Sequence, residues 1–302
     1  MRALDTPLCG LLGVRFPIVQ APMANVQPPE LAAVVSNAGA LGSIAGATLS
    51  ADELRAAIRG VRAATAGAFA VNLFAPPYLR EGALEVVLEE RPPVFSFTFG
   101  IVEPAPLREA GIVVLGTATS ADEARVLADA GVDAVVAQGA EAGGHRGSFL
   151  DGFPLVPLAE LVPACVEAVS VPVVAAGGIV DGAGIAEALR LGAQGVSVGT
   201  AFLFTPECRV PADWRDALRS HATVVTPAYS GRPARAARTP FLAELMAGPP
   251  PLPYPEQRRR VEARPGAERF FLGGVAAPRA RELGVAELVR ALVAEAEAAA
   301  RD

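Results

Sequence analysis

Val135-Val136-Ala137-Gln138-Gly139-Ala140-Glu141-Ala142-Gly143-Gly144-His145-Arg146-Gly147 is the stretch that decides the fold. It starts as an apolar run typical of a buried strand and then breaks into a glycine-rich loop. The loop carries His145, one of only two histidines in the chain. Glycine lets the backbone approach a ligand closely, and histidine can change its charge near neutral pH. The stretch therefore predicts a strand that ends in a reactive loop, with a surface histidine in a simple turn as the alternative.

The same local pattern recurs along the chain: a helix, a glycine, two residues and an apolar strand. Copies lie around Gly39, Gly131 and Gly192, and a weaker one starts at Gly111. The strands expected in this way cover residues 17–23, 41–45, 69–74, 94–99, 112–115, 135–138, 173–179 and 196–201. Alternating helices and short apolar strands favour parallel βαβ units, and this number predicts an α/β TIM (β/α)8 barrel. An open doubly wound sheet is the alternative, although no dinucleotide-type glycine fingerprint follows the first strand.

The βαβ rhythm stops after about Pro211. We therefore predict a barrel over residues 1–212, a small, mostly helical domain over 213–278 that covers the barrel mouth, and a C-terminal helix over 279–302 that packs back on the barrel. His221, at the start of the middle segment, is expected to be structural. Two serine-glutamate pairs, Ser50 with Glu53 and Ser120 with Glu123, predict capping boxes at the starts of two barrel helices.

Composition narrows the function classes. A net charge of -6 argues against a dedicated nucleic-acid binder. The three cysteines, Cys9, Cys165 and Cys208, lack metal-type spacing, so we expect reduced thiols and no metal site. No stretch resembles a signal peptide or a membrane span, which predicts a cytoplasmic protein without a membrane partner. The sequence leaves the oligomeric state open, with a homodimer as one option.

Glycines follow two successive strands near the middle of the chain. Gly177-Gly178 ends one strand and Gly199-Thr200 ends the next. In barrels of this type, the loops after the seventh and eighth strands commonly bind phosphate through backbone N–H groups. The pair therefore predicts a phosphorylated cofactor, although a glycine after a strand can also serve only to make a turn. Asn72 stands inside an apolar strand, where its amide needs either a ligand or a backbone partner.

Six motifs in this order resemble the nitronate monooxygenase family, formerly called 2-nitropropane dioxygenases. They are Gln20-Ala21-Pro22-Met23-Ala24, Ser36-Asn37-Ala38-Gly39-Ala40-Leu41-Gly42, Val71-Asn72-Leu73-Phe74, the Gln138 to Gly147 loop, Ala176-Gly177-Gly178-Ile179 and Val198-Gly199-Thr200-Ala201-Phe202-Leu203. The resemblance covers about Pro17 to Leu203 and continues more loosely to the end. Flavin-dependent enoyl-acyl-carrier-protein reductases are also similar, including a Glu-Ala-Gly-Gly-His loop.

The resemblance implies FMN held noncovalently at the carboxyl end of the barrel. By this similarity the isoalloxazine is lined by Pro22, Met23 and Ala24, and its polar edge bonds to Asn72 and Gln138. The phosphate is held by Gly177, Gly178, Gly199 and Thr200. The ring also lies against Gly144, beside His145. His145 would remove the α-proton of a nitroalkane or stabilise the nitronate. The implied reaction uses O2 and gives a carbonyl compound and nitrite.

Two other functions remain open at this stage. The chain could be an NAD(P)H-dependent flavin reductase, such as an enoyl-acyl-carrier-protein reductase, or a catalytically idle barrel used for binding.

Two positions depart from the family pattern. Asn25 stands where relatives more often have glycine, and Gly273-Gly274-Val275-Ala276 stands where many have Gly-Gln followed by a small residue.

Overall fold

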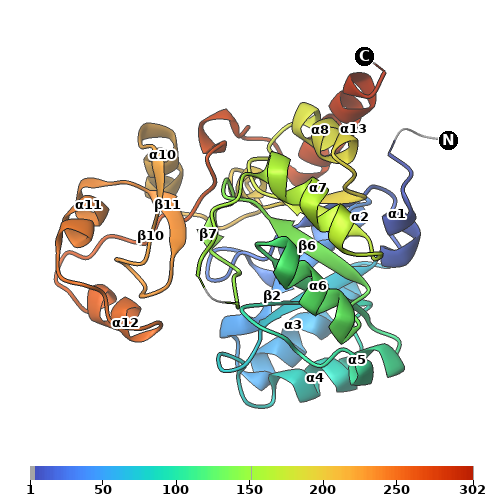
Figure 1. Ribbon diagram of the computed structural model, residues 1–302, viewed down its shortest axis with the longest axis horizontal. Helices are drawn as coiled ribbons and strands as arrows, with labels where there is room; N and C mark the ends of the chain where they lie inside the picture. Colours follow the sequence, from blue (N-terminus) through green and yellow to red (C-terminus); the bar gives the residue numbers. More distant parts are fainter. Residues whose placement is uncertain (1–3, 151, 302) are drawn as a thin grey trace.

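Eight parallel strands form the centre of the molecule. In the computed structural model, which describes residues 4–150 and 152–301, they pair in the order β1-β9-β8-β6-β5-β4-β3-β2 (Figure 1). The strands are β1 (Ile18–Gln20), β2 (Gly42–Ala45), β3 (Phe69–Phe74), β4 (Val94–Thr98), β5 (Val113–Ala118), β6 (Ala134–Gln138), β8 (Val173–Ala176) and β9 (Gly195–Val198). A parallel bridge between Val19 and Leu41 joins β1 to β2 and closes the sheet on itself. The predicted TIM barrel is therefore confirmed, and the open sheet is wrong.

Helices cover the outside of this barrel. They are α2 (Pro29–Asn37), α3 (Ala51–Ala64), α4 (Ala83–Glu90), α5 (Ala105–Glu109), α6 (Ala121–Ala130), α7 (Leu158–Ala168), α8 (Gly182–Arg190) and α13 (Val285–Ala299). The apolar face of α13 contacts both α8 and α2, so this helix fills the eighth helix position of the barrel. Among the described residues, no helix combines the length and apolarity that crossing a membrane requires.

The core has two layers because the barrel strands are buried on both faces. One layer lies between strands and helices, and β6 shows how the sequence provides it: Val135 and Ala137 belong to that outer layer, whereas Ala134 belongs to the barrel interior. A short helix that the sequence pattern did not predict, α1 (Pro7–Leu12), inserts Leu8 and Leu12 into the interior layer. This plug fills one end of the barrel and leaves the carboxyl end of the strands for a site.

Glycine ends several of the barrel helices. Gly39, Gly131 and Gly192 have φ values of 92°, 96° and 99°, the left-handed conformation that other residues rarely adopt. This conformation explains why the helix, glycine and strand pattern repeats along the sequence.

The two predicted capping boxes have different outcomes. The box of Ser50 and Glu53 is present in full. At Ser120 the serine hydroxyl does accept the backbone N–H of Glu123, but the Glu123 carboxylate turns away from its own helix. It accepts from the N–H and hydroxyl of Thr119 and from the N–H groups of Phe149 and Leu150. Sequence spacing alone could not reveal the donors Phe149 and Leu150, which lie 26 and 27 residues after Glu123.

Residues 212–272, which we call the cap, follow β9 and the short α9 (Thr200–Leu203) and lie to one side of the barrel (Figure 1). The cap contains α10 (Ala212–Ser220), β10 (Thr223–Thr226), β11 (Ala234–Ala237), α11 (Pro240–Ala247) and α12 (Glu256–Glu262). It has its own apolar cluster, which includes Tyr229, Leu242 and Phe270. The antiparallel pair β10–β11 was not predicted, and β11 also pairs with β7 (Gly144–His145) of the barrel loop. The exact domain limits stay a prediction.

Candidate active site

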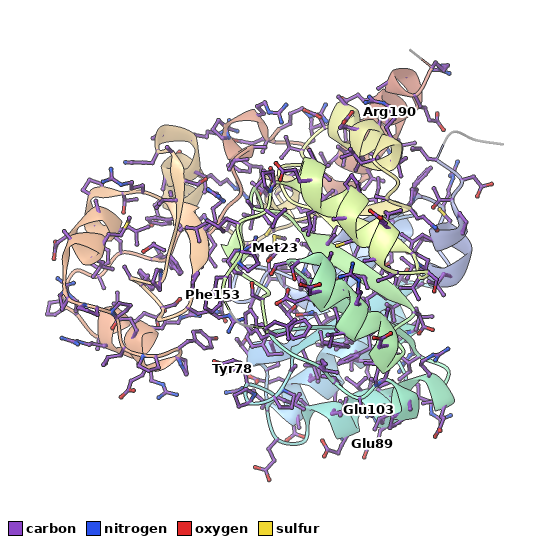
Figure 2. All side chains as sticks on the ribbon, viewed as in Figure 1. Met23, Tyr78, Glu89, Glu103, Phe153 and Arg190 are labelled. Carbon is purple, nitrogen blue, oxygen red and sulfur yellow. The ribbon has the colours of Figure 1, made fainter. Side chains whose placement is uncertain are left out.

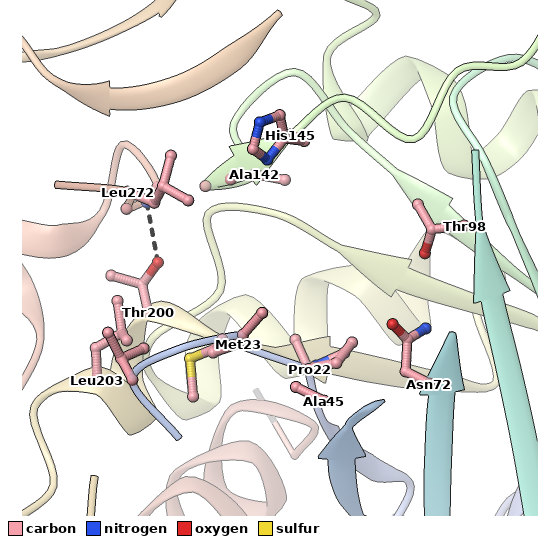
Figure 3. A pocket seen from close by; sticks show the side chains of 18 of the residues that line it. Pro22, Met23, Ala45, Asn72, Thr98, Ala142, His145, Thr200, Leu203 and Leu272 are labelled. Carbon is pink, nitrogen blue, oxygen red and sulfur yellow. Dashed lines mark hydrogen bonds between the residues drawn. The ribbon is translucent and has the colours of Figure 1, made fainter. Parts of the chain in front are cut away.

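A cavity of about 580 Å³ lies at the carboxyl ends of the barrel strands and extends to the cap. Its volume is typical of a site for a small molecule or cofactor. All the residues singled out from the sequence for catalysis or cofactor binding line it: Pro22, Met23, Ala24, Asn72, Gln138, Gly144, His145, Gly177, Gly178, Gly199 and Thr200. In Figure 3, Ala142 and His145 lie on one side of an open space, and Pro22, Met23 and Ala45 lie on the other.

The loop that carries His145 is held at both ends by backbone pairing and by one side chain. β7 pairs with β11 of the cap, and the N–H of Arg146 donates to the carbonyl of Pro233. Gln138, the last residue of β6, donates from Nε2 to the carbonyl of His145 (3.0 Å) and accepts the N–H of Gly147 at Oε1 (2.8 Å). Its amide therefore shapes the loop, although the side chain also faces the cavity.

Three arginines, two of them buried (Arg146 and Arg232), reinforce this loop. The guanidinium of Arg146, which has no exposed surface, donates to the carbonyls of Gly139 (2.7 Å) and Gln138 (2.8 Å). Arg235 donates to the carbonyl of Ala140 (2.7 Å), and Arg232 donates to the carbonyls of Arg146 and Ser148. Within residues 4–150 and 152–301, none of the three forms a salt bridge. The carboxylates of Glu123 and Glu141 act on the charge of Arg146 from a longer distance, and Glu141 also acts on that of Arg235.

The hydrogen bonds of Ser230 define the tautomer of His145. The Ser230 hydroxyl donates to the carbonyl of Arg232 (3.0 Å). Because a hydroxyl has only one hydrogen, a Ser230 that donates to Arg232 must accept the proton of Nε2 in its 3.0 Å contact with His145. Nδ1 is then the nitrogen with a free lone pair, available to accept a proton.

Burial keeps the His145 imidazole neutral. Removal from water lowers its pKa from 6.5 to about 3, and the positive charges of Arg258 and Arg232 act in the same direction. The pKa is this low because the cap and the arginines surround the ring. A histidine of this kind is a weak base until a negative charge lies beside it.

The two glycine pairs form one corner of the cavity. Gly177 and Gly178 have φ values of 127° and 72°, and a Cβ at Gly177 would come within 2.9 Å of the N atom of Ala142. Within the described part of the chain, the N–H groups of Gly178, Gly199 and Thr200 have no hydrogen-bond acceptor. Unpaired N–H groups beside residues without side chains form a suitable place for an anion.

Several polar and aromatic residues of the cavity were not identified from the sequence. Ser96, Thr98 and Thr117 come from β4 and β5, and Ser96 accepts the amide N–H of Asn72 at 3.0 Å. Polar residues inside otherwise apolar strands were the available signal. Tyr254 and Phe270 come from the cap, where no sequence periodicity connects them to the barrel. Asn25, the departure from the family pattern, has φ of 69°, so the turn after Ala24 is left-handed even without glycine.

The comparisons with known proteins agree with this architecture. The family model described as nitronate monooxygenase matches residues 5–81 and 78–295. Proteins named probable nitronate monooxygenase are 38% identical over 306 residues in Staphylococcus saprophyticus subsp. saprophyticus (86% of each chain) and 39% identical over 295 residues in Staphylococcus aureus strain JH9 (83% of each chain).

Two solved structures are similar over almost their whole length. Nitroalkane oxidase from Streptomyces ansochromogenes has a TM-score of 0.90 and 35% identity, covering 97% of this chain and 98% of that one. FabK from Thermotoga maritima has a TM-score of 0.84 and 32% identity, covering 98% of this chain and 97% of that one. A family match over nearly the entire barrel and cap, together with these relatives, shows that the chain belongs to the nitronate monooxygenase family and is an oxidoreductase.

Proposed function

We propose that this enzyme oxidises alkyl nitronates with O2, using FMN, to a carbonyl compound and nitrite. The observation that carries the proposal is the position of His145, across an open space from Pro22 and Met23 and in the same cavity as the glycine corner (Figure 3). A flat cofactor ring between these walls would have its reactive face beside the imidazole. Family membership supports the reaction class.

The chain's own residues fit FMN. The unpaired N–H groups of Gly178, Gly199 and Thr200 suit a phosphate, because each can donate without losing a protein partner. Gly178 leaves the corner free of a side chain, since a Cβ there would already come within 3.1 Å of the Glu141 Cβ. Asn72 uses its amide nitrogen on Ser96, which leaves its carbonyl oxygen for a cofactor N–H. Bound there, FMN supplies reversible electron transfer between the nitronate and O2.

The overall reaction balances without any further reductant. The C=N bond of the nitronate breaks, a C=O bond forms with an oxygen atom from O2, and the nitro nitrogen leaves as nitrite with the original negative charge. Two nitronates therefore consume one O2. The protein must bind the anion, orient it and keep water out of the site, and the cap residues that line the cavity serve the last purpose.

His145 would orient and stabilise the substrate more readily than it would deprotonate one. With a pKa of about 3 in the free protein, the imidazole is a poor acceptor for a carbon-bound proton. A bound nitronate anion raises that pKa by direct attraction and makes a protonated imidazole favourable. We therefore propose that preformed nitronates are better substrates than neutral nitroalkanes, and that Ser230 holds the ring in the orientation this requires.

Anaerobic mixing tests the reaction class. Propionate 3-nitronate or the nitronate of 2-nitropropane should remove the absorbance of the oxidised flavin without NAD(P)H. Loss of that absorbance with NADH alone, and no response to either nitronate, would contradict the proposal and favour the reductase. A protein that is colourless and cannot be reconstituted with FMN would instead favour a binding function.

Replacing His145 with Asn tests its role. The variant should keep the yellow flavin but lose turnover of the preformed nitronate, because the group that orients and stabilises the anion is removed. An unchanged rate would show that His145 is not part of the reaction.

A further inference from the structure

Aromatic side chains are concentrated in the cavity. The chain has few of them, about 6% of its residues. Yet the single tryptophan, two of the three tyrosines and three of the thirteen phenylalanines line the cavity: Trp214, Tyr229, Tyr254, Phe74, Phe99 and Phe270. Elsewhere the core is made mainly of Ala, Val and Leu, with a smaller number of phenylalanines, among them Phe95, Phe97 and Phe202.

Three of these rings surround the imidazole itself. Tyr254 lies 5.5 Å from the His145 ring centre, and Phe99 and Phe270 lie 6.1 Å from it, each with its plane at a steep angle to the imidazole. Phe99 comes from the barrel, whereas Tyr254 and Phe270 come from the cap. A substrate group beside His145 would therefore lie among the edges and faces of these three rings. Aromatic groups favour this kind of offset or edge-to-face contact.

The three arginines of the cavity wall each have an acidic neighbour. Arg258 contacts Glu262 at 2.7 Å, Arg269 contacts Asp213 at 2.6 Å and Arg209 lies 4.0 Å from Glu30. Among the described residues that line the cavity, no arginine lacks an acidic neighbour. A second carboxylate on the substrate would compete with these acids and would lose its hydration among aromatic rings.

We infer that the preferred substrate is a nitronate whose carbon skeleton carries an aryl group, such as the nitronate of phenylnitromethane. The inference rests on the proposed nitronate oxidation and adds the substrate class. The nitronate group would lie beside His145, and the aryl group would contact Tyr254 and Phe270. The product would be an aromatic aldehyde, formed with nitrite by the same exchange of C=N for C=O.

Steady-state kinetics with three nitronates test this inference on the FMN-loaded enzyme. The nitronate of phenylnitromethane should have the highest kcat/KM, ethyl nitronate should be intermediate and propionate 3-nitronate should be lowest. Tyr254→Leu should reduce the ratio of aryl to ethyl kcat/KM by about two- to tenfold, because one ring contact is lost. Tyr254→Phe keeps the ring and should keep the ratio. Phe16→Leu, a ring removal on a residue outside the cavity wall, is the matched control and should also keep it.

Equal or lower kcat/KM for the aryl nitronate in the unaltered enzyme would overturn the inference, as would an unchanged ratio in Tyr254→Leu. Binding of benzaldehyde and of acetaldehyde, measured by the change in flavin absorbance, distinguishes failure of this inference from failure of the proposed nitronate oxidation. If no nitronate is consumed at all, the proposed function fails. Tighter binding of benzaldehyde than of acetaldehyde would then still support an aromatic site, and equal binding would reject it.

Discussion

Acid should destabilise this protein through His145, and replacing that residue with Gln should remove the effect. The imidazole has a pKa of about 3 in the folded protein because it is buried beside Arg258 and Arg232, against 6.5 in an exposed histidine. Between these two values the unfolded chain binds a proton that the folded chain does not. Stability is therefore fully present above pH 6.5 and falls as the pH decreases toward 3.

The size of this loss of stability depends on how far the pH lies below 6.5. At pH 5 the difference is 1.5 pH units, and at about 1.4 kcal/mol per unit the unaltered protein should lose about 2 kcal/mol through this one residue. The ring also faces a cavity that admits water, which makes this value an upper figure. The carboxylates that titrate in the same range are common to both proteins and cancel in the comparison.

Urea unfolding at pH 7.5 and pH 5.0, with matched flavin content, gives the required difference. His145→Gln should lose up to about 2 kcal/mol less than the unaltered protein over this interval. His221→Gln is the control, because His221 lies at the end of α10 with Nδ1 near the carbonyl of Ala217, away from the cavity wall. An identical pH dependence in His145→Gln and the unaltered protein would refute the view that a buried neutral imidazole lies in this loop.

Three further changes test other parts of the site. Gly178→Asp should abolish FMN retention, measured by the flavin to protein ratio. Gly111→Asp is the control: it shares the left-handed backbone but has open space around it, so it should retain FMN. Full FMN occupancy in Gly178→Asp would show that the phosphate binds elsewhere. Ser230→Ala should reduce kcat for nitronate by about tenfold or less, because the ring loses one neutral hydrogen bond, while FMN content stays the same; an unchanged kcat would remove Ser230 from the positioning role. Glu123→Gln should lower the free energy of unfolding by about 1–3 kcal/mol, since the amide NH2 would face either the N–H groups of Phe149 and Leu150 or the N–H of Thr119. A stability equal to that of the unaltered protein would show that these bonds are dispensable.

The sequence was sufficient for the barrel because each strand carries its own local signal. Val173–Ala176, for example, is apolar, lies between a helix and a glycine pair, and is buried throughout. The candidate site was predictable for the same reason: residues at the carboxyl ends of parallel strands meet at one end of the barrel, so Asn72, Gln138 and Gly177 had to approach one another.

Other features depend on partners far apart in the chain. β7 is only two residues long and pairs with β11 some 90 residues later, so no periodicity could indicate it. The helix α1 has six residues, too few for a helical repeat to stand out. The low pKa of His145 could not be predicted, because it depends on burial of the ring and on the nearby charges of Arg258 and Arg232, both remote in sequence. Local patterns predict elements, whereas the environment of a side chain comes from tertiary packing.

The position of the cap within the chain affects how the molecule can assemble. The eighth strand is followed by the entire cap, and only then does α13 arrive to occupy the gap between α8 and α2. The contact is close, since a Cβ on Gly182 would come within 2.3 Å of the N atom of Ala296, and Glu295 accepts the N–H of Gly182 at 2.9 Å. The cap must therefore be synthesised before α13 can complete the ring of helices around the barrel. Removing α13 would open a seam along the first and last βα units, and the damage would reach the glycine corner of the cavity.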